Sequence, residues 1–317
     1  MLTALTFAVA LTAALLATPI VRGIAIRRGY LDVPGGRKIH QAPVPRLGGV
    51  AMVVAFLIAI GVAALSSQSM GGPTGLQSDR VLAIVAGTAV LVAVGIIDDL
   101  RGMRASVKLV AQVTAAVIAW ALGLSIDALH LPWTVIELGW LSLPATVLWV
   151  VAIINAVNLI DGLDGLASGV VLAAFGAFAV VAALGRVDPA LIVVAAASGA
   201  AVGFLAYNLY PASIIMGDTG SMFLGFIVAA VAVSLTQDGS NPVGPWFPIL
   251  ALAIPIADTV WAIVRRALSG GSVFEADRGH IHHQLLERGV TQRDAMLVLT
   301  AAAAIGATIA ILTARAG

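Results

Sequence analysis

The chain has 317 residues, of which 60% are apolar and only 10% are charged, and its mean hydropathy is +1.05. Soluble domains carry roughly 25% charged residues, so this composition excludes an ordinary soluble protein and indicates one that lies in a membrane. The formal net charge of +1 gives no reason to expect a nucleic-acid partner, and the absence of cysteine excludes disulfides and thiolate metal sites.

Ten apolar segments are predicted to span a membrane as helices, since a span needs about 20 mostly apolar residues. The first segment has no basic stretch before it, and its arginines follow it, so we interpret it as a retained helix rather than a cleaved secretory signal. No internal repeat or second domain is visible, which predicts one all-α, polytopic integral-membrane domain over residues 1–317. The predicted spans are residues 2–21, 47–65, 81–97, 107–124, 141–157, 166–184, 190–207, 221–235, 247–264 and 295–313.

Lysine and arginine lie mostly on one side of this arrangement. Fourteen of the 17 basic residues fall in or at the edge of the linkers after the first, third and ninth predicted spans, with Lys108 at the second position of the fourth span. Because basic residues favour the cytoplasmic side of a membrane, the linkers that follow odd-numbered spans are predicted to be cytoplasmic. Both chain termini are then predicted to be extracytoplasmic.

Four polar segments interrupt the apolar pattern, and each follows an odd-numbered span. A charged side chain near lipid is costly and usually marks a functional site, so packing alone does not explain these segments. The order of the spans places all four on the predicted cytoplasmic face, where they would form one acidic site. In chain order they are Asp98-Asp99, Asn158-Leu-Ile-Asp161-Gly-Leu-Asp164-Gly, Met216-Gly-Asp218-Thr-Gly-Ser221 and Asp277-Arg-Gly-His280-Ile-His282-His283.

The residue types in these segments suit phosphate chemistry with a hard metal ion. Carboxylates without thiolates favour Mg²⁺, with Mn²⁺ as the alternative. Mg²⁺ takes one or two protein carboxylates and completes its shell with water and phosphate oxygens. More carboxylates than one ion needs are therefore present, and some are expected to bind substrate; the five are Asp98, Asp99, Asp161, Asp164 and Asp218. Acidic and basic groups at a membrane border predict a phosphorylated, water-soluble donor that reacts with a lipid. The basic groups are Arg37, Lys38, Arg46, Arg278 and the three histidines.

Five segments in series resemble the polyprenyl-phosphate N-acetylhexosamine-1-phosphate transferases. The last of them, at residues 277–283, is similar to the WecA/TagO-like branch, which starts O-antigen, teichoic acid and related envelope polymers. The resemblance covers essentially the whole chain in order, including the ten-span layout. The other four segments are Arg37-Lys-Ile-His40 with Pro45-Arg-Leu-Gly48-Gly49, the Asp98-Asp99 pair, residues 158–165 and residues 216–221.

The resemblance implies a reaction. N-acetylglucosamine 1-phosphate would pass from UDP-N-acetylglucosamine to undecaprenyl or decaprenyl phosphate, with Mg²⁺ and release of UMP, as the first membrane step of a cell-envelope glycopolymer. It further implies a bacterial plasma membrane, an active site that faces the cytoplasm, and a homodimer. A phosphate monoester has a second pKa of about 6, so the acceptor is already mostly ionised, and we expect direct attack rather than a covalent aspartyl intermediate.

The roles of the family's residues carry over to the matching positions. Asp218 is the first candidate metal ligand and Asp99 the second, while the 98–99 pair is expected to orient the lipid phosphate. Asp164 and Asn208 are expected near the uridine. The full catalytic set is Asp98, Asp99, Asp161, His280, His282 and His283, and the full substrate-binding set is Lys38, His40, Asn158, Asp164, Asn208 and Arg278.

Other protein classes share parts of this pattern. A secondary transporter also has many spans, but its sites lie near the membrane midplane and often accompany inverted repeats, which are not visible here. A CDP-alcohol phosphotransferase needs an arginine soon after the first Asp-Gly, where this chain has Leu-Ala-Ser-Gly. Within the resembled family, the phospho-MurNAc-pentapeptide transferases of peptidoglycan synthesis have three consecutive histidines, where this chain has His280-Ile-His282-His283.

Several of the same residues also have a purely structural interpretation. The 98–99 pair and Asp218 could cap helix ends, and the three histidines could belong to a solvated loop. Asp258, inside the ninth predicted span, could pair with Arg265 or Arg266 or line the site. The sequence leaves these alternatives open.

Overall fold

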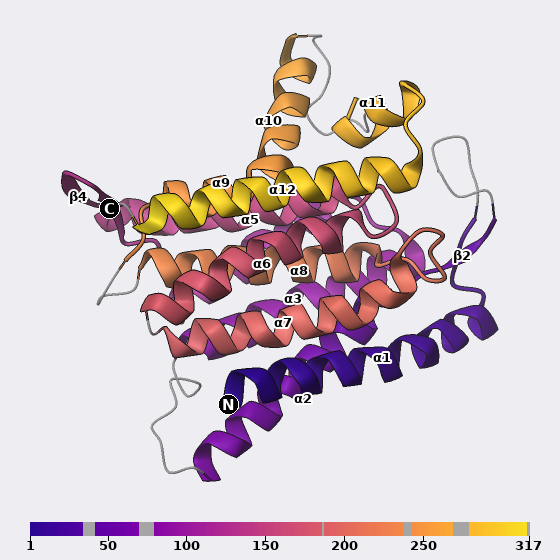
Figure 1. The fold of residues 1–317 in the computed structure, drawn as a ribbon, viewed down its shortest axis with the longest axis horizontal. Coiled ribbons are helices and arrows are strands. Elements are labelled where there is room, and N and C mark those ends of the chain that lie inside the picture. Colours follow the sequence, from indigo (N-terminus) through magenta and orange to yellow (C-terminus); the bar gives the residue numbers. More distant parts are fainter. Residues whose placement is uncertain (34–41, 70–78, 186, 238–241, 269–278, 316–317) are drawn as a thin grey trace.

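The computed structural model describes residues 1–33, 42–69, 79–185, 187–237, 242–268 and 279–315. Within these ranges the protein is mostly helical, as predicted, and its long helices lie roughly side by side in one bundle (Figure 1). The bundle helices are α1 (Leu2–Arg28), α2 (Gly48–Ser69), α3 (Asp79–Arg101), α4 (Ala105–Ala121), α5 (Ser142–Ile160), α6 (Leu166–Gly185), α7 (Asp188–Asn208), α8 (Gly217–Thr236) and α12 (Gln292–Arg315).

Eight helices in the described part of the chain are long and apolar enough to cross a membrane. They are the bundle helices other than α4, which is apolar but has only 17 residues. At 1.5 Å per residue α4 is about 25 Å long, a little less than the roughly 30 Å hydrocarbon core of a bilayer. These helices support a multi-pass membrane protein, and the number of ten spans stays a prediction.

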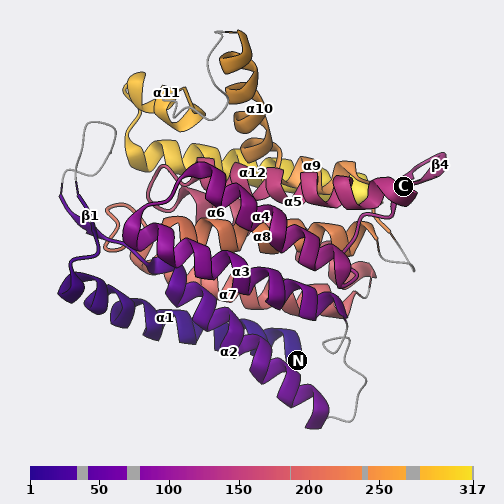
Figure 2. The ribbon, with the colours of Figure 1, turned by 180° about the vertical axis from the view of Figure 1, so that it is seen from behind.

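The prediction of one continuous span over residues 247–264 is wrong. The segment forms two helices, α9 (Trp246–Ala251) and α10 (Ala253–Leu268), and α10 turns away from the bundle (Figures 1 and 2). Pro255 explains the break, because in a continuous helix its ring would clash with the carbonyl of Ala251, four residues earlier. A proline is tolerated in the first turn of a helix, which is where α10 places it.

Helix α8 forms the centre of the bundle. It packs against α2, α3, α5 and α6, and its apolar stretch is fully buried. Glycines allow the closest approaches, as small residues do between membrane helices. A Cβ atom on Gly49 would lie 2.1 Å from the backbone nitrogen of Gly220, and one on Gly225 would lie 2.7 Å from the Cα of Ile154. This packing brings the N-terminus of α8, with Asp218, close to the neighbouring helices.

The two ends of the bundle carry different short elements (Figures 1 and 2). One end carries the antiparallel pair β3 (Ala128–Leu131) and β4 (Thr134–Glu137), and both chain termini lie toward it. The opposite end carries α11 (Ile281–Glu287) and the antiparallel pair β1 (Leu31–Asp32) and β2 (Val44–Pro45). The sequence predicts neither strand pair. Which side of a membrane each end faces stays a prediction.

Candidate active site

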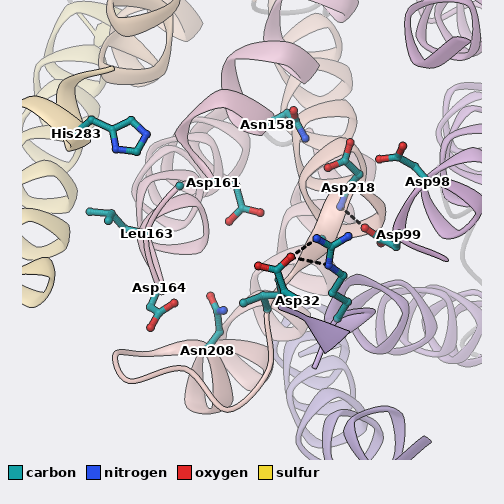
Figure 3. A pocket seen from close by; sticks show the side chains of 14 residues that line it. Asp32, Asp98, Asp99, Asn158, Asp161, Leu163, Asp164, Asn208, Asp218 and His283 are labelled. Atoms are coloured by element: carbon teal, nitrogen blue, oxygen red, sulfur yellow. Dashed lines mark hydrogen bonds and ion pairs between the residues drawn. The ribbon is translucent and has the colours of Figure 1, made fainter. Parts of the chain in front are cut away.

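The polar segments that were predicted to converge line one cavity of about 310 Å³. Figure 3 shows their side chains around this cavity, from the end of α3, the turn between α5 and α6, the start of α8 and the histidine segment. The structure therefore confirms that four segments far apart in the sequence meet in one place. The predicted site residues that line the cavity are Asp98, Asp99, Asn158, Asp161, Asp164, Asn208, Asp218 and His283.

Asp99 holds the N-terminus of α8. Its Oδ1 accepts the backbone N–H of Asp218 at 2.8 Å, and its Oδ2 accepts the backbone N–H and the hydroxyl of Thr219 at 3.1 and 2.6 Å. A carboxylate at this position satisfies N–H groups that have no partner within the helix and interacts favourably with the helix dipole. A Cβ on Gly217 would lie 2.5 Å from Asp99 Oδ1, so this approach requires glycine.

Lys108 joins two of the predicted aspartates. Its Nζ lies 2.5 Å from Asp218 Oδ2 and 3.2 Å from Asp98 Oδ2. The other oxygen of Asp98 accepts the backbone N–H of Met103 at 2.5 Å. Sequence analysis did not assign Lys108 to the site, although a lysine inside the apolar segment 107–124 is the kind of intramembrane charge that marks one.

Asn158 and Asp161 occupy the end of α5 and the turn that follows. Asn158 Nδ2 donates to Ser221 Oγ at 2.7 Å, which ties α5 to the first turn of α8. The Asp161 carboxylate points into the cavity (Figure 3) and has no hydrogen-bond partner among the described residues. Burial raises the pKa of Asp161 well above its usual range, and the charges of Asp218, Asp99 and Asp164 raise it further. A bound cation would relieve this excess of negative charge.

Asp164 and Asn208 connect two chain segments at the cavity, and both side chains are almost fully buried. Asp164 Oδ2 accepts the backbone N–H of Ala212 at 2.9 Å. Asn208 accepts from Gly165 N at 3.1 Å and donates to the carbonyl of Ile214 at 3.0 Å. These bonds connect the turn after α5 to the segment before α8, so both residues shape the cavity as well as line it.

Two charged residues outside the predicted site residues, Asp32 and Arg46, also line the cavity. Asp32 on β1 is 6% exposed and forms an ion pair with Arg46, which follows β2 (Figure 3). The strand pair brings a cation to the acidic cavity from the N-terminal part of the chain. Arg46 belongs to the basic groups that the sequence singled out, but nothing in the sequence pattern marked Asp32.

A second cavity of about 550 Å³ adjoins the first and shares four of its lining residues, Asn158, Gly162, Asp218 and His283. Its walls come from α4, α5, α8, α10 and the histidine segment, and they include apolar side chains such as Leu109, Leu159, Met222 and Ile263. The two cavities meet at Asp218. One is lined mainly by polar groups, and the other combines polar and apolar walls.

The three histidines lie together, and all of them line the second cavity. The rings of His280 and His282 are stacked at 5.9 Å, and those of His282 and His283 lie 4.3 Å apart. Burial and the neighbouring His283 lower the pKa of His282 to about 4, so this ring is neutral near neutral pH. A Cβ on Gly162 would lie 2.2 Å from His282 Nε2, so the ring packs directly on the turn that carries Asp161.

Three predicted substrate-binding residues lie outside the described residues. Lys38 and His40 fall within residues 34–41, and Arg278 falls within residues 269–278. Their placement in the site stays a prediction.

Comparison with known proteins agrees with this geometry. Residues 81–236 match the glycosyl transferase family 4 model. A Bacillus subtilis (strain 168) protein named "Probable undecaprenyl-phosphate N-acetylglucosaminyl 1-phosphate transferase" is 36% identical over 299 residues, which cover 92% of this chain and 80% of that protein. The chain belongs to glycosyl transferase family 4.

Two further members of the family match over the same share of the chain. The decaprenyl-phosphate N-acetylglucosaminephosphotransferase of Mycobacterium tuberculosis (strain ATCC 25618 / H37Rv) is 34% identical over 92% of this chain and 78% of its own length. The undecaprenyl-phosphate alpha-N-acetylglucosaminyl 1-phosphate transferase of Escherichia coli (strain K12) is 28% identical over 92% and 78%. The family predicted from the sequence is confirmed.

A divalent metal ion is typical of this family of phosphotransferases. Among the described residues no three carboxylate or imidazole groups form a complete metal-binding cluster. Mg²⁺ needs only one or two protein carboxylates when phosphates and water complete its shell. Asp218 and Asp161 both line the first cavity and can supply these carboxylates. Asp99 fits this role less well than predicted, because its two oxygens already accept three hydrogen bonds.

Proposed function

We propose that this chain transfers N-acetylglucosamine 1-phosphate from UDP-N-acetylglucosamine to a polyprenyl phosphate and releases UMP. We place the reaction at the cytoplasmic face of a bacterial plasma membrane. The names of the relatives support the lipid phosphate acceptor and the sugar phosphate that is transferred. The homodimer suggested by the family resemblance belongs to the same proposal.

The observation that carries the proposal is the junction of two unlike cavities at Asp218. A water-soluble nucleotide donor needs polar surroundings, which the first cavity offers. A polyprenyl phosphate needs a charged position next to apolar walls, which the second cavity offers through Lys108 and the side chains of α4, α5 and α10. We assign the uridine end of the donor to the first cavity and the lipid phosphate to the second.

The reaction then takes place where the cavities meet. An oxygen of the lipid phosphate attacks the β-phosphorus of the donor, a new phosphoanhydride bond forms, and the bond between the β-phosphorus and the bridging oxygen breaks as UMP leaves. Two anions must approach each other for this, so catalysis depends on positioning and charge neutralisation more than on a strong base.

Lys108 supplies one of the positive charges that this step needs. Its ammonium group lies between Asp98 and Asp218, and it can donate to a phosphate oxygen that enters beside them. Arg266 lines the same cavity and adds a second cationic group. A Mg²⁺ ion held by Asp218 and Asp161 would neutralise the diphosphate.

Purified protein tests the proposal directly. With Mg²⁺, a polyprenyl phosphate and a panel of UDP-sugars, we expect UMP release with UDP-N-acetylglucosamine, and we expect EDTA to stop it. The Asp218→Asn and Asp161→Asn variants should lose at least about 100-fold in rate, because each removes a carboxylate that would hold the Mg²⁺ ion which neutralises the diphosphate. Asp294→Asn is the matched control, since Asp294 lies in the first turn of α12, where its carboxylate accepts a hydrogen bond from the hydroxyl of Thr291.

The panel of donors separates the alternatives. No UMP from UDP-N-acetylglucosamine or UDP-N-acetylgalactosamine would refute the proposal. Release only with UDP-MurNAc-pentapeptide would move the chain to the peptidoglycan branch. Substrate exchange across proteoliposomes without chemical turnover would indicate a transporter.

A further inference from the structure

Asp258 on α10 makes two hydrogen bonds to the histidine segment. Its Oδ2 lies 2.8 Å from His280 Nδ1, and its Oδ1 accepts the backbone N–H of Ile281 at 2.8 Å. Both side chains of the Asp258–His280 contact are buried, with 6% of Asp258 and 5% of His280 exposed. One carboxylate therefore fixes an imidazole ring and the first N–H of α11 at the same time.

This contact decides among the alternatives that the sequence leaves open for Asp258. Its described partners are on the histidine segment rather than Arg265 or Arg266. Arg265 instead donates from Nη1 to the carbonyl of Gly279 at 2.8 Å. Two residues of α10, seven positions and about two turns apart, thus hold residues 279–281. Figures 1 and 2 show α11 beside the outward-pointing α10.

The contacts continue from Asp258 to the acidic turn. His280 stacks on His282, and His282 packs against Gly162, next to Asp161. Every step of this path is a buried contact, since His280 and His282 are 5% and 2% exposed. A change in the orientation of His280 would therefore reach the junction of the two cavities.

The chemistry of the pair also determines which ring nitrogen is available. An ionised carboxylate only accepts hydrogen bonds, so the hydrogen of His280 lies on Nδ1 and Nε2 is left for a ligand in the second cavity. Carboxylates orient functional imidazoles in this way in many enzymes.

We propose that Asp258 is a positioning residue, which holds His280 in the orientation and tautomer that present Nε2 as a hydrogen-bond acceptor to a hydroxyl or amide N–H of the donor's sugar, which would extend from the junction into the second cavity. The assignment of a ligand to His280 rests on the proposed function. The connection between Asp258 and the histidine segment does not.

Three variants separate the two bonds of Asp258. In Asp258→Asn the side-chain oxygen can still accept from Ile281, but the amide NH₂ now faces His280 Nδ1 and reverses its tautomer. Asp258→Ala removes both bonds, and Asp258→Glu keeps the carboxylate. We expect Asp258→Asn to lower kcat/KM for UDP-N-acetylglucosamine by about 10- to 100-fold, the usual effect of removing such an orienting partner. Asp258→Glu should retain more activity than Asp258→Ala.

A double-mutant cycle distinguishes positioning of His280 from a general structural role. In a His280→Ala background, Asp258→Asn should have no further effect on kcat/KM, because its target ring is absent. If the two substitutions lower kcat/KM by independent factors that multiply in the double variant, the proposal is overturned. An Asp258→Asn variant with activity within twofold of the unsubstituted protein would also overturn it. Asp294→Asn again serves as the carboxylate control, because Asp294 is not among the residues that line the two cavities.

Hydrogen exchange provides a measurement that does not depend on activity. The amides of residues 281–284 should exchange faster in Asp258→Ala than in the unsubstituted protein, whereas Asp258→Asn should retain most of the protection. Unchanged exchange in Asp258→Ala would overturn the proposal even if the enzyme is active. If the unsubstituted protein releases no UMP, the proposed function fails, while the exchange data still decide whether Asp258 holds this segment.

Discussion

Asp99 and Asp218 both line the cavity, but their carboxylates have different partners. The two carboxylate oxygens of Asp99 accept three hydrogen bonds from the first turn of α8, so both oxygens are already engaged with that helix. Asp218 is the first charged residue of that helix and pairs with Lys108. The structure thus favours a supporting role for Asp99 and a substrate- or metal-facing role for Asp218.

This difference leads to a prediction about stability. Asp99→Ala should lower the free energy of unfolding by roughly 1–2 kcal/mol, the usual cost of losing a carboxylate cap, and should also reduce activity because Asp218 loses its anchor. Asp218→Asn should reduce activity to a similar degree with little change in stability. Thermal unfolding in detergent and UMP release, measured on the same samples, provide the check. Equal melting temperatures for Asp99→Ala and the unsubstituted protein would contradict the capping role.

At this scale the sequence predicts which residues meet but not how they bond. The order of the apolar segments is enough to bring Asp98, Asp161 and Asp218 to one end of the bundle. The division of labour among them depends on hydrogen bonds between residues about 120 positions apart, such as Asp99 to Asp218 and Thr219. Lys108 lies inside an apolar segment, which is a sequence signal, but its pairing with Asp98 and Asp218 appears only when α4 lies beside the start of α8.

At the scale of the elements, α8 is held by close contacts with helices on several sides. A Cβ on Gly95 of α3 would lie 2.6 Å from the Cα of Thr219, and one on Gly49 of α2 would lie 2.1 Å from the nitrogen of Gly220. The atoms of α8 in these contacts belong to the backbone, which cannot move aside as a flexible side chain would. The position of Asp218 depends on this packing.

Gly49→Ala is therefore expected to be destabilising. The added methyl group forces α2 and α8 apart, at a cost of about 1–3 kcal/mol, and should lower activity because the start of α8 shifts. Gly61→Ala on the same helix is the matched control, since a Cβ there meets nothing within 4 Å, and removing a helical glycine should stabilise by up to about 1 kcal/mol. Unfolding in detergent gives both values. A Gly49→Ala protein as stable as Gly61→Ala would show that the α2–α8 contact is looser than described.

Hydropathy predicts most of the bundle helices but not the direction of each element. The segment 247–264 is apolar throughout, so its composition hides the break before Pro255 and the outward turn of α10. That break places Asp258 beside His280, which a continuous span would not do. The strand pairs were missed because β1 and β2 have two residues each, too few to produce a recognisable alternation.

At the scale of the whole molecule, the cavity and the two termini lie at opposite ends of the bundle. The end with the termini also carries the β3–β4 pair, and Trp133 and Trp140 are 79% and 84% exposed there. Exposed tryptophans are typical of the membrane–water interface. Arg46, Lys108 and Arg266, which belong to or adjoin the linkers predicted to be cytoplasmic, line the two cavities. Both observations favour a membrane plane that crosses the bundle helices, with the cavity on the cytoplasmic side.

Single cysteines can test this orientation, because the chain contains none of its own. Thr134→Cys on β4 and Ser106→Cys at the start of α4 are conservative changes at exposed positions on opposite ends of the bundle. In intact cells a membrane-impermeant maleimide should label Thr134→Cys, and it should label Ser106→Cys only after the membrane is permeabilised. The reverse pattern would place the cavity outside the cell, where UDP-sugars are not supplied by cytoplasmic metabolism, and the proposed reaction would lose its donor. Labelling of both positions in intact cells would mean that the helices between them do not separate two compartments.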